Sequence, residues 1–129
     1  MSSIPFDLSK IRAFVLDMDG VVSATVSPIG PDGMPMRTVN VKDGYAMQYA
    51  VKQGYTLAVI SGGASEAMTQ RFHQLGAKHV YMRVSDKAAQ LDILCQEAGI
   101  TPDQIAYIGD DIPDIPIMKL VALPCAPAD

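Results

Sequence analysis

Residues 14–22 of the chain read FVLDMDGVV, an apolar run that leads directly into two carboxylates. The run that ends at Leu16 is typical of an interior strand of a parallel sheet. Asp17 and Asp19 follow it at once, where loss of water penalises their charge. An unpaired charge in such a place is costly or is neutralised. The stretch therefore predicts a compensating cation at the end of a buried strand.

The composition predicts one ordinary globular domain over residues 1–129, because 49% of the residues are hydrophobic and only 19% are charged. The net charge of −4 argues against nucleic acid or an anionic membrane as partner. No run approaches the ~18 apolar residues of a membrane span, and the first residues lack the pattern of a signal peptide. Cys95 and Cys125 lack metal-ligand spacing, so we expect a cytoplasmic protein with reduced thiols.

Apolar runs alternate with helical patterns along the chain. Strands are expected at 12–17, 55–61, 78–82, 105–110 and 121–125. Helices are expected at 43–54, 65–76 and 86–99, with a short one at 114–119 and a β-hairpin at about 21–42. Strands that alternate with helices in this way indicate a three-layer, Rossmann-like α/β domain with a parallel sheet.

Local signals refine the helices. Asp43 and Ser65 are the expected N-caps of the first two, and Gly54 is expected to close the first. The TPDQ sequence at 101–104 predicts a capping box. The inward face of the helix at 86–99 is expected to consist of Ala88, Leu91, Cys95 and Ala98.

Polar side chains follow the expected strands, at the edge where open α/β sheets bind ligands. They are Asp17 and Asp19 after the first strand, Ser61 after the second, Lys87 after the third, and Asp110, Asp111 and Asp114 after the fourth. Each has a structural explanation when taken singly, as a turn, loop polarity or a helix cap. Lys87 is the exception, because a cation in the first turn of a helix is disfavoured by about 0.3–1 kcal/mol. The convergence of all these groups favours a functional site. His73 and His79 have no partner at metal-ligand spacing and are expected to be surface or packing residues.

Such a set of carboxylates needs a cation, since two like charges ~4 Å apart repel by roughly 4 kcal/mol at an effective dielectric of 20. Oxygen ligands without histidine or thiolate select a hard ion, and Mg²⁺ suits a site that also binds phosphate. Mg²⁺ and Lys87 are therefore the expected compensating charges. The same set suits phosphoryl transfer, with Asp17 attacking phosphorus to form an aspartyl-phosphate. Asp19 is placed to act as the general acid and base.

The segments DMDGVV, VISGG, SDK and YIGDDIPD resemble, in the same order, the four motifs of the haloacid dehalogenase-like (HAD) phosphatases. The resemblance implies that Asp17 is the nucleophile and Asp19 the general acid and base. It implies that Ser61, Gly62, Lys87 and Arg71 bind the substrate phosphate. It also implies that Mg²⁺ is held by Asp17, the main-chain carbonyl of Asp19, and Asp110, with Asp111 and Asp114 as outer or alternate ligands.

Residues 17–54 further resemble the small, capless branch typified by 3-deoxy-D-manno-octulosonate 8-phosphate (KDO 8-P) phosphatase. The pattern N-x-x-D-G-Y of that branch is matched by Asn40, Asp43, Gly44 and Tyr45. The resemblance implies hydrolysis of KDO 8-P to KDO and phosphate in lipopolysaccharide core synthesis. It also implies a homotetramer that is assembled by the hairpins, in which a neighbouring subunit takes the place of a cap domain.

Four other functions share parts of this pattern, and the order of the motifs excludes one of them. One is a phosphatase of a related nine-carbon sugar acid 9-phosphate, and another is a catalytically silent HAD-like binding protein. A phosphomutase or phosphotransferase would share the aspartyl-phosphate step, but a capless site is open to water, which favours hydrolysis. A signalling receiver domain is excluded because its lysine follows the acidic pair, whereas Lys87 precedes Asp110 and Asp111.

Overall fold

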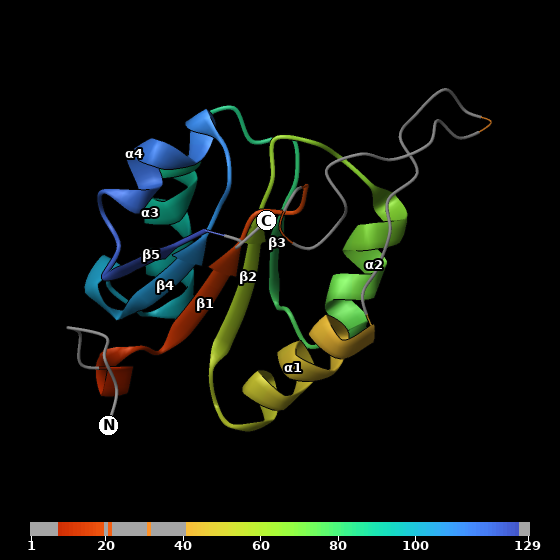
Figure 1. Cartoon of the computed structure of the whole chain (residues 1–129), viewed down its shortest axis with the longest axis horizontal. Coiled ribbons are helices and arrows are strands. Elements are labelled where there is room, and N and C mark those ends of the chain that lie inside the picture. Colours follow the sequence, from red (N-terminus) through yellow and green to blue (C-terminus); the bar gives the residue numbers. More distant parts are fainter. Residues whose placement is uncertain (1–7, 20, 22–30, 32–40, 127–129) are drawn as a thin grey trace.

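The computed structural model describes residues 8–19, 21, 31 and 41–126 (Figure 1). Its centre is a five-stranded parallel sheet with the order β3-β2-β1-β4-β5. The strands are β1 (Ala13–Leu16), β2 (Thr56–Ile60), β3 (His79–Tyr81), β4 (Ile105–Ile108) and β5 (Leu123–Cys125). The helices are α1 (Val41–Lys52), α2 (Glu66–Gln74), α3 (Lys87–Ala98) and α4 (Ile115–Met118), with 3₁₀ turns at Leu8–Lys10, Pro102–Gln104 and Ile112–Asp114. The predicted Rossmann-like α/β class is confirmed.

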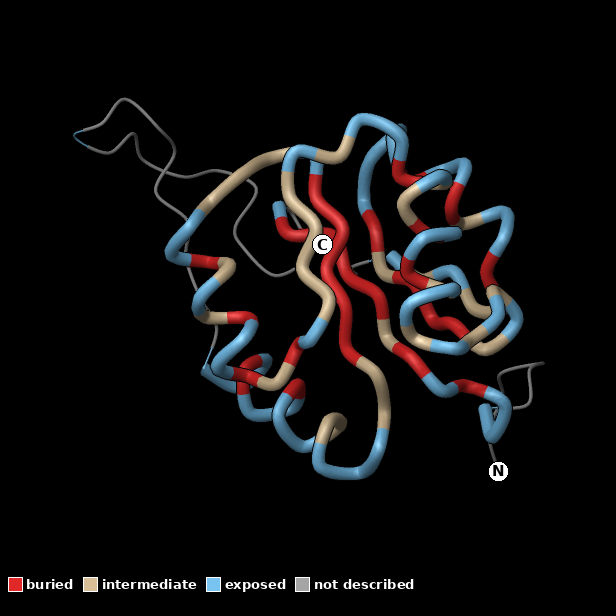
Figure 2. Tube along the Cα trace, turned by 180° about the vertical axis from the view of Figure 1, so that it is seen from behind, coloured by how far each residue is buried: buried red, intermediate tan, exposed pale blue. Residues whose placement is uncertain are grey.

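The helices cover both faces of the sheet and form three layers. Helices α1 and α2 lie on one face, and α3 and α4 lie on the other (Figure 1). Each face has its own apolar core. Met47, Met68 and Phe72 pack on the first face, whereas Leu91 and Ile117 pack on the second. The buried residues are concentrated in the central strands between these layers (Figure 2).

Strand β1 is the centre of the sheet, because it pairs with β2 on one side and with β4 on the other. Ala13 and Val15 are completely buried. The backbone pairing continues one residue past the strand, where the N–H of Asp17 donates to the carbonyl of Ile108 at 3.0 Å. Asp17 therefore lies at the carboxyl edge of the sheet, directly after a strand that is paired on both sides.

Most of the capping signals are confirmed, and one helix start is corrected. The Ser65 hydroxyl accepts from the N–H of Met68 at 3.2 Å and caps α2. Gln104 Oε1 accepts from the N–H of Thr101 at 3.1 Å, as the predicted capping box requires. Helix α1 was expected to begin at an Asp43 cap but begins at Val41, so Asp43 lies in the first turn. A carboxylate is favourable there too, because it faces the positive end of the helix dipole.

The inward face of α3 agrees with the prediction at three positions and is wider than predicted. Leu91 is buried in the core of this face, and Cys95 and Ala98 are partly buried and pack against it. Ala88 is only partly buried. Lys87 and Leu94 are also buried, and Leu94 was not among the residues expected in the core.

The predicted hairpin at about 21–42 lies almost entirely outside the described residues. Among the helices that are described, none has the length and apolar character needed to cross a bilayer.

Candidate active site

A hollow of about 350 Å³ opens beyond the carboxyl ends of the strands. We call it the strand-end hollow. It is lined by Asp17, Asp19, Ser61, Gly62, Gly63, Val84, Ser85, Lys87, Asp110, Asp111 and Pro113. These residues come from four separate stretches of sequence, and each stretch follows a different strand. The fold thus brings together seven of the residues that the sequence predicts for the site: Asp17, Asp19, Ser61, Gly62, Lys87, Asp110 and Asp111.

A larger hollow of about 480 Å³ lies between α1 and the sheet, but its chemistry is different. Its lining is mainly apolar, with Phe14, Met47 and Ile108 among the contributors, and Asp43 is the one carboxylate among the described residues that line it. Apolar side chains neither transfer protons nor bind metal ions, so this lining does not suit acid–base or metal chemistry. The strand-end hollow is therefore the candidate active site.

Asp17 lies at the floor of the strand-end hollow and is only 7% exposed. Its Oδ1 accepts a hydrogen bond from the N–H of Met18 at 2.8 Å and lies 3.2 Å from the ammonium nitrogen of Lys87. Burial raises the pKa of Asp17 to about 6, an effect that Lys87 opposes and the nearby charge of Asp114 reinforces. The carboxylate is thus oriented by its two contacts but is costly to ionise without a further cation.

Lys87 is buried at the start of α3, with 7% of its surface exposed. Its Nζ donates to Asp114 Oδ1 at 2.6 Å, in addition to the ion pair with Asp17. The preceding residue, Asp86, caps the helix by accepting from the N–H of Ala89 at 3.1 Å. The cap satisfies the helix end, and the two carboxylates offset the unfavourable position of the lysine in the helix dipole.

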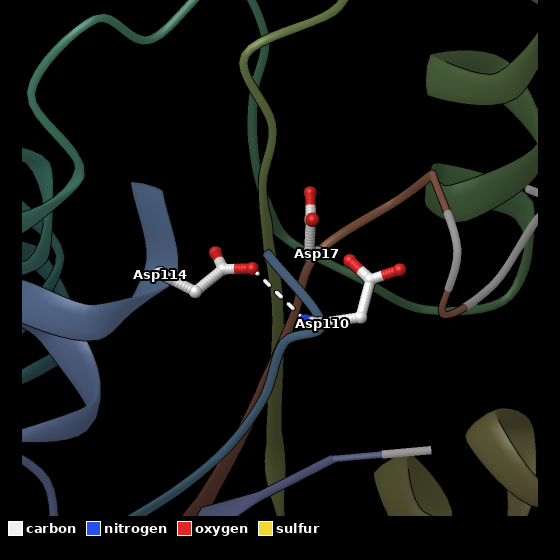
Figure 3. A group of neighbouring side chains, drawn as sticks. All are labelled: Asp17, Asp110 and Asp114. Atoms are coloured by element: carbon white, nitrogen blue, oxygen red, sulfur yellow. Dashed lines mark hydrogen bonds between the residues drawn. The ribbon is translucent and has the colours of Figure 1, made fainter. Parts of the chain in front are cut away.

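Asp114 is completely buried and carries the densest set of contacts in the site. Oδ1 accepts from Lys87 Nζ and from the hydroxyl of Tyr107. Oδ2 accepts from the N–H of Asp110 at 3.1 Å (Figure 3). It also accepts from the N–H of Asp111 at 3.2 Å. Although burial disfavours its charge, the hydrogen bonds from Lys87 and Tyr107 lower the pKa of Asp114, which therefore stays ionised.

Tyr107 is the site residue that sequence reasoning missed. It was assigned only to a strand, yet it is completely buried in β4 and its hydroxyl donates to Asp114. Burial and the Asp114 carboxylate raise its pKa far above the usual range, so it stays a neutral donor. The available signal was a tyrosine within an interior strand, since a buried phenol must find a hydrogen-bond partner.

The remaining predicted residues lie at the walls and rim of the hollow. Ser61 is 1% exposed, and its hydroxyl accepts from the N–H of Gly63 at 3.1 Å. Asp19, Asp110 and Asp111 are exposed at the rim. Burial and the neighbouring carboxylates, Asp114 first among them, raise the pKa of Asp110.

Arg71 does not line the strand-end hollow. It is partly buried on α2, and a methyl group built on Gly44 would lie 3.1 Å from its Nη2. The guanidinium therefore lies beside the start of α1, and its predicted contact with phosphate stays a prediction. His73 is an exposed residue whose Nδ1 lies 2.9 Å from the carbonyl oxygen of Ala77, in keeping with a packing role.

Three carboxylates are close enough to share a cation. One oxygen from each of Asp17, Asp110 and Asp114 lies within 4.8 Å of the others (Figure 3). The set contains neither histidine nor thiolate, so its donors suit a hard divalent ion such as Mg²⁺. The raised pKa values of Asp17 and Asp110 agree with this, because acids that are costly to ionise alone are the ones that a cation stabilises.

The curated proteins and the solved structures that resemble this chain point to the same kind of protein. No protein-family model matches the chain. It is 35% identical over 120 residues to 3-deoxy-D-manno-octulosonate 8-phosphate phosphatase from Escherichia coli K12, a match that covers 93% of this chain and 64% of that protein. The chain therefore spans about two thirds of the length of the curated relatives it matches.

Solved structures agree. The cobalt-bound deoxy-D-mannose-octulosonate 8-phosphate phosphatase of Haemophilus influenzae superposes with a TM-score of 0.89 and 30% identity, over 95% of this chain and 71% of that one. The KDO 8-P phosphatase of Moraxella catarrhalis was solved with magnesium, phosphate and KDO. It superposes with a TM-score of 0.83 and 30% identity, over 89% of this chain and 66% of that one.

The sheet order and the set of acids around a lysine define the HAD class of α/β proteins. Within that class, the chain belongs to the family of the 3-deoxy-D-manno-octulosonate 8-phosphate phosphatases.

The raised pKa of Asp17 predicts a pH-dependent effect of Mg²⁺ on stability. The pKa is about 6 in the folded protein against the ordinary 3.8, so ionisation destabilises the metal-free fold as the pH rises between these values. Mg²⁺ bound to this carboxylate would remove the penalty. We expect its affinity to fall by up to about tenfold per pH unit below pH 6.

The measurement is the rise in melting temperature that a fixed MgCl₂ concentration produces at about pH 5 and about pH 7.5. The rise should be larger at the higher pH, and Asp17→Asn should reduce both the rise and its dependence on pH. An equal rise at both pH values in the unmodified protein would contradict the assignment of Asp17 to the metal.

Proposed function

We propose that this chain is a Mg²⁺-dependent phosphomonoesterase that works through an aspartyl-phosphate on Asp17. The observation that supports this most directly is the buried Asp17 carboxylate, 3.2 Å from the Lys87 ammonium. It lies in a hollow that Ser61 and Asp110 also line. A nucleophile needs this combination of fixed orientation and adjacent positive charge.

In the first half-reaction, the Asp17 carboxylate attacks phosphorus and the ester P–O bond breaks. Asp19 donates a proton to the leaving alcohol. In the second half-reaction, Asp19 takes a proton from water, the oxygen attacks the aspartyl-phosphate, and inorganic phosphate is released with Asp17 restored. The two steps balance without any co-reactant other than water.

The charge of the phosphate, about −1.5 to −2 near neutral pH, is held by Lys87, the Ser61 hydroxyl and the backbone at Gly62. Asp17, Asp110 and the main-chain carbonyl of Asp19 would hold Mg²⁺, which supplies further neutralisation of the phosphate oxygens. Asp111 and Asp114 complete the acidic set outside these ligands. Arg71 is assigned to the phosphate by the family resemblance.

For the substrate we propose KDO 8-P, which would be hydrolysed to KDO and phosphate in lipopolysaccharide core synthesis. The support comes from the relatives, since the matching curated proteins are named for this activity and the M. catarrhalis structure contains KDO and phosphate. Because the chain spans only part of those proteins, the substrate is the finer part of the proposal.

We also propose a cytoplasmic homotetramer. Val41, Tyr45 and Tyr49 are spaced four residues apart on α1 and are 78%, 71% and 56% exposed, an apolar stripe of the kind that interfaces cover. The two cysteines are unpaired thiols, which suits a reducing compartment. Light scattering that gives the mass of a single 13.8 kDa chain would contradict the tetramer.

Replacement of Asp17 tests the nucleophile. The unmodified protein is expected to release phosphate from an aryl phosphate only when Mg²⁺ is present. Asp17→Asn should lower kcat by about 10³-fold or more, because the amide cannot form the covalent intermediate. Asp92→Asn is the matched control, since Asp92 is an exposed residue of α3 outside the hollow and its loss should leave kcat unchanged. Turnover that survives in Asp17→Asn rules out this nucleophile.

A substrate panel tests the sugar acid. It compares KDO 8-P and a nine-carbon sugar acid 9-phosphate with sugar phosphates that lack a carboxylate. We expect kcat/KM to be highest for KDO 8-P, by at least about tenfold over the sugars without a carboxylate, because an unmatched charged group costs 1.4 kcal/mol or more. Preference for the nine-carbon acid would reassign the substrate. Equal rates on all sugars would remove the sugar-acid assignment and leave the phosphatase proposal intact.

A further inference from the structure

The carboxylate of Asp114 has a full set of hydrogen-bond donors from the protein. Lys87 and Tyr107 donate to Oδ1, and the N–H groups of Asp110 and Asp111 donate to Oδ2. A carboxylate offers about four acceptor positions, so these four donors account for all of them. Although one oxygen of Asp114 lies within reach of the other two acids, its lone pairs are already directed at other groups. The Asp114 carboxylate therefore holds these four donor groups in place.

Three of the four donors belong to groups that the proposed reaction depends on. Lys87 lies between Asp114 and Asp17, at 2.6 Å and 3.2 Å from their oxygens. The two N–H groups belong to the loop that carries the Asp110 carboxylate into the strand-end hollow. Gly109 allows this packing, since a methyl group there would lie 2.5 Å from Asp114 Cγ. A shift of Asp114 would thus move both the lysine and the Asp110 loop.

Tyr107 connects the Asp114 carboxylate to the most rigid part of the fold. Its strand, β4, pairs with β1 on one side and β5 on the other, and the ring is completely buried in the apolar core against α3 and α4. Packing alone would be served by phenylalanine, and a buried hydroxyl is costly unless it is paired. Its partner is the Asp114 oxygen that also binds Lys87.

We infer that Tyr107 is a positioning residue: its hydroxyl fixes the Asp114 carboxylate, which in turn holds Lys87 beside Asp17 and holds the loop of Asp110. The inference rests on the proposed phosphatase function for its kinetic consequences. It makes Asp114 the holder of the catalytic groups, and it leaves Asp17 and Asp110 as the acids available to Mg²⁺.

The kinetic test compares Tyr107→Phe with Tyr81→Phe. The control removes the same atom from a tyrosine whose hydroxyl donates to Glu97 at 2.8 Å, outside the strand-end hollow. With Mg²⁺ and an aryl phosphate, Tyr107→Phe should lower kcat by about tenfold or more. KM should rise by less than kcat falls, because Ser61 and Gly62 still bind the phosphate when Lys87 is displaced. A kcat for Tyr107→Phe within about twofold of the control overturns the inference.

A second test needs no activity and no metal. Urea unfolding of the metal-free protein gives the folding equilibrium constant of the unmodified chain, Tyr107→Phe, Asp114→Asn and the double variant. Tyr107→Phe should lower this constant by about tenfold in the unmodified background, but by less than about threefold in the Asp114→Asn background. Equal losses in both backgrounds mean that Tyr107 serves packing alone, and they overturn the inference.

The two tests separate this inference from the proposed function. If the unmodified protein releases no phosphate from any substrate, the proposed function fails, and the unfolding cycle still decides whether Tyr107 acts through Asp114. If Tyr107→Phe does not fold, NMR of the unmodified protein decides. A Tyr107 hydroxyl proton that exchanges slowly, and faster in Asp114→Asn, supports the inference. A Tyr107 hydroxyl proton that exchanges too fast to be observed in the unmodified protein overturns it.

Discussion

The site depends on one buried ammonium group that is shared by two carboxylates. Lys87 Nζ lies 2.6 Å from Asp114 and 3.2 Å from Asp17, and all three residues are at most 7% exposed. Each member alone would be an uncompensated buried charge, and removal of one partner from such a group costs about 3–5 kcal/mol. The contact joins the end of β1, the start of α3 and the loop after β4. It therefore ties the geometry of the site to that of the sheet.

The sheet topology explains why these distant residues meet. Because every strand is parallel, every carboxyl end falls on the same edge, and the order β3-β2-β1-β4-β5 puts β1 between β2 and β4. Asp17 is thus flanked by the residues that follow β2 and β4. Burial at this edge raises the pKa of Asp17 to about 6. Hydrogen bonds lower the pKa of Asp114 and keep it ionised. A site with one acid that is costly to ionise and another that is held ionised suits a cation and an anionic substrate together.

Much of the site could be predicted because its residues carry local signals. Asp17 and Asp19 interrupt an apolar strand, and Lys87 stands where a helix disfavours a cation. Both features are visible without coordinates, and all three residues line the hollow. Arg71 lies outside the hollow beside Gly44, because the direction of a long side chain on α2 depends on how that helix packs against α1. The burial of Leu94 on α3 was not predicted for a similar reason, because it depends on how that helix packs on the sheet.

The sequence by itself determined the class of fold and the order of chemical groups along the edge, because strand and helix periodicity and the residues that end each strand are properties of short segments. Only the tertiary structure decided how those groups are bonded to one another. In the sequence, Tyr107 is one more residue of an apolar strand and Asp114 is one more acid after it, and only β4 and the following turn bring the phenol and the carboxylate together. Hydrogen bonds of this kind depend on distances between segments that are remote in the chain, and packing alone sets those distances.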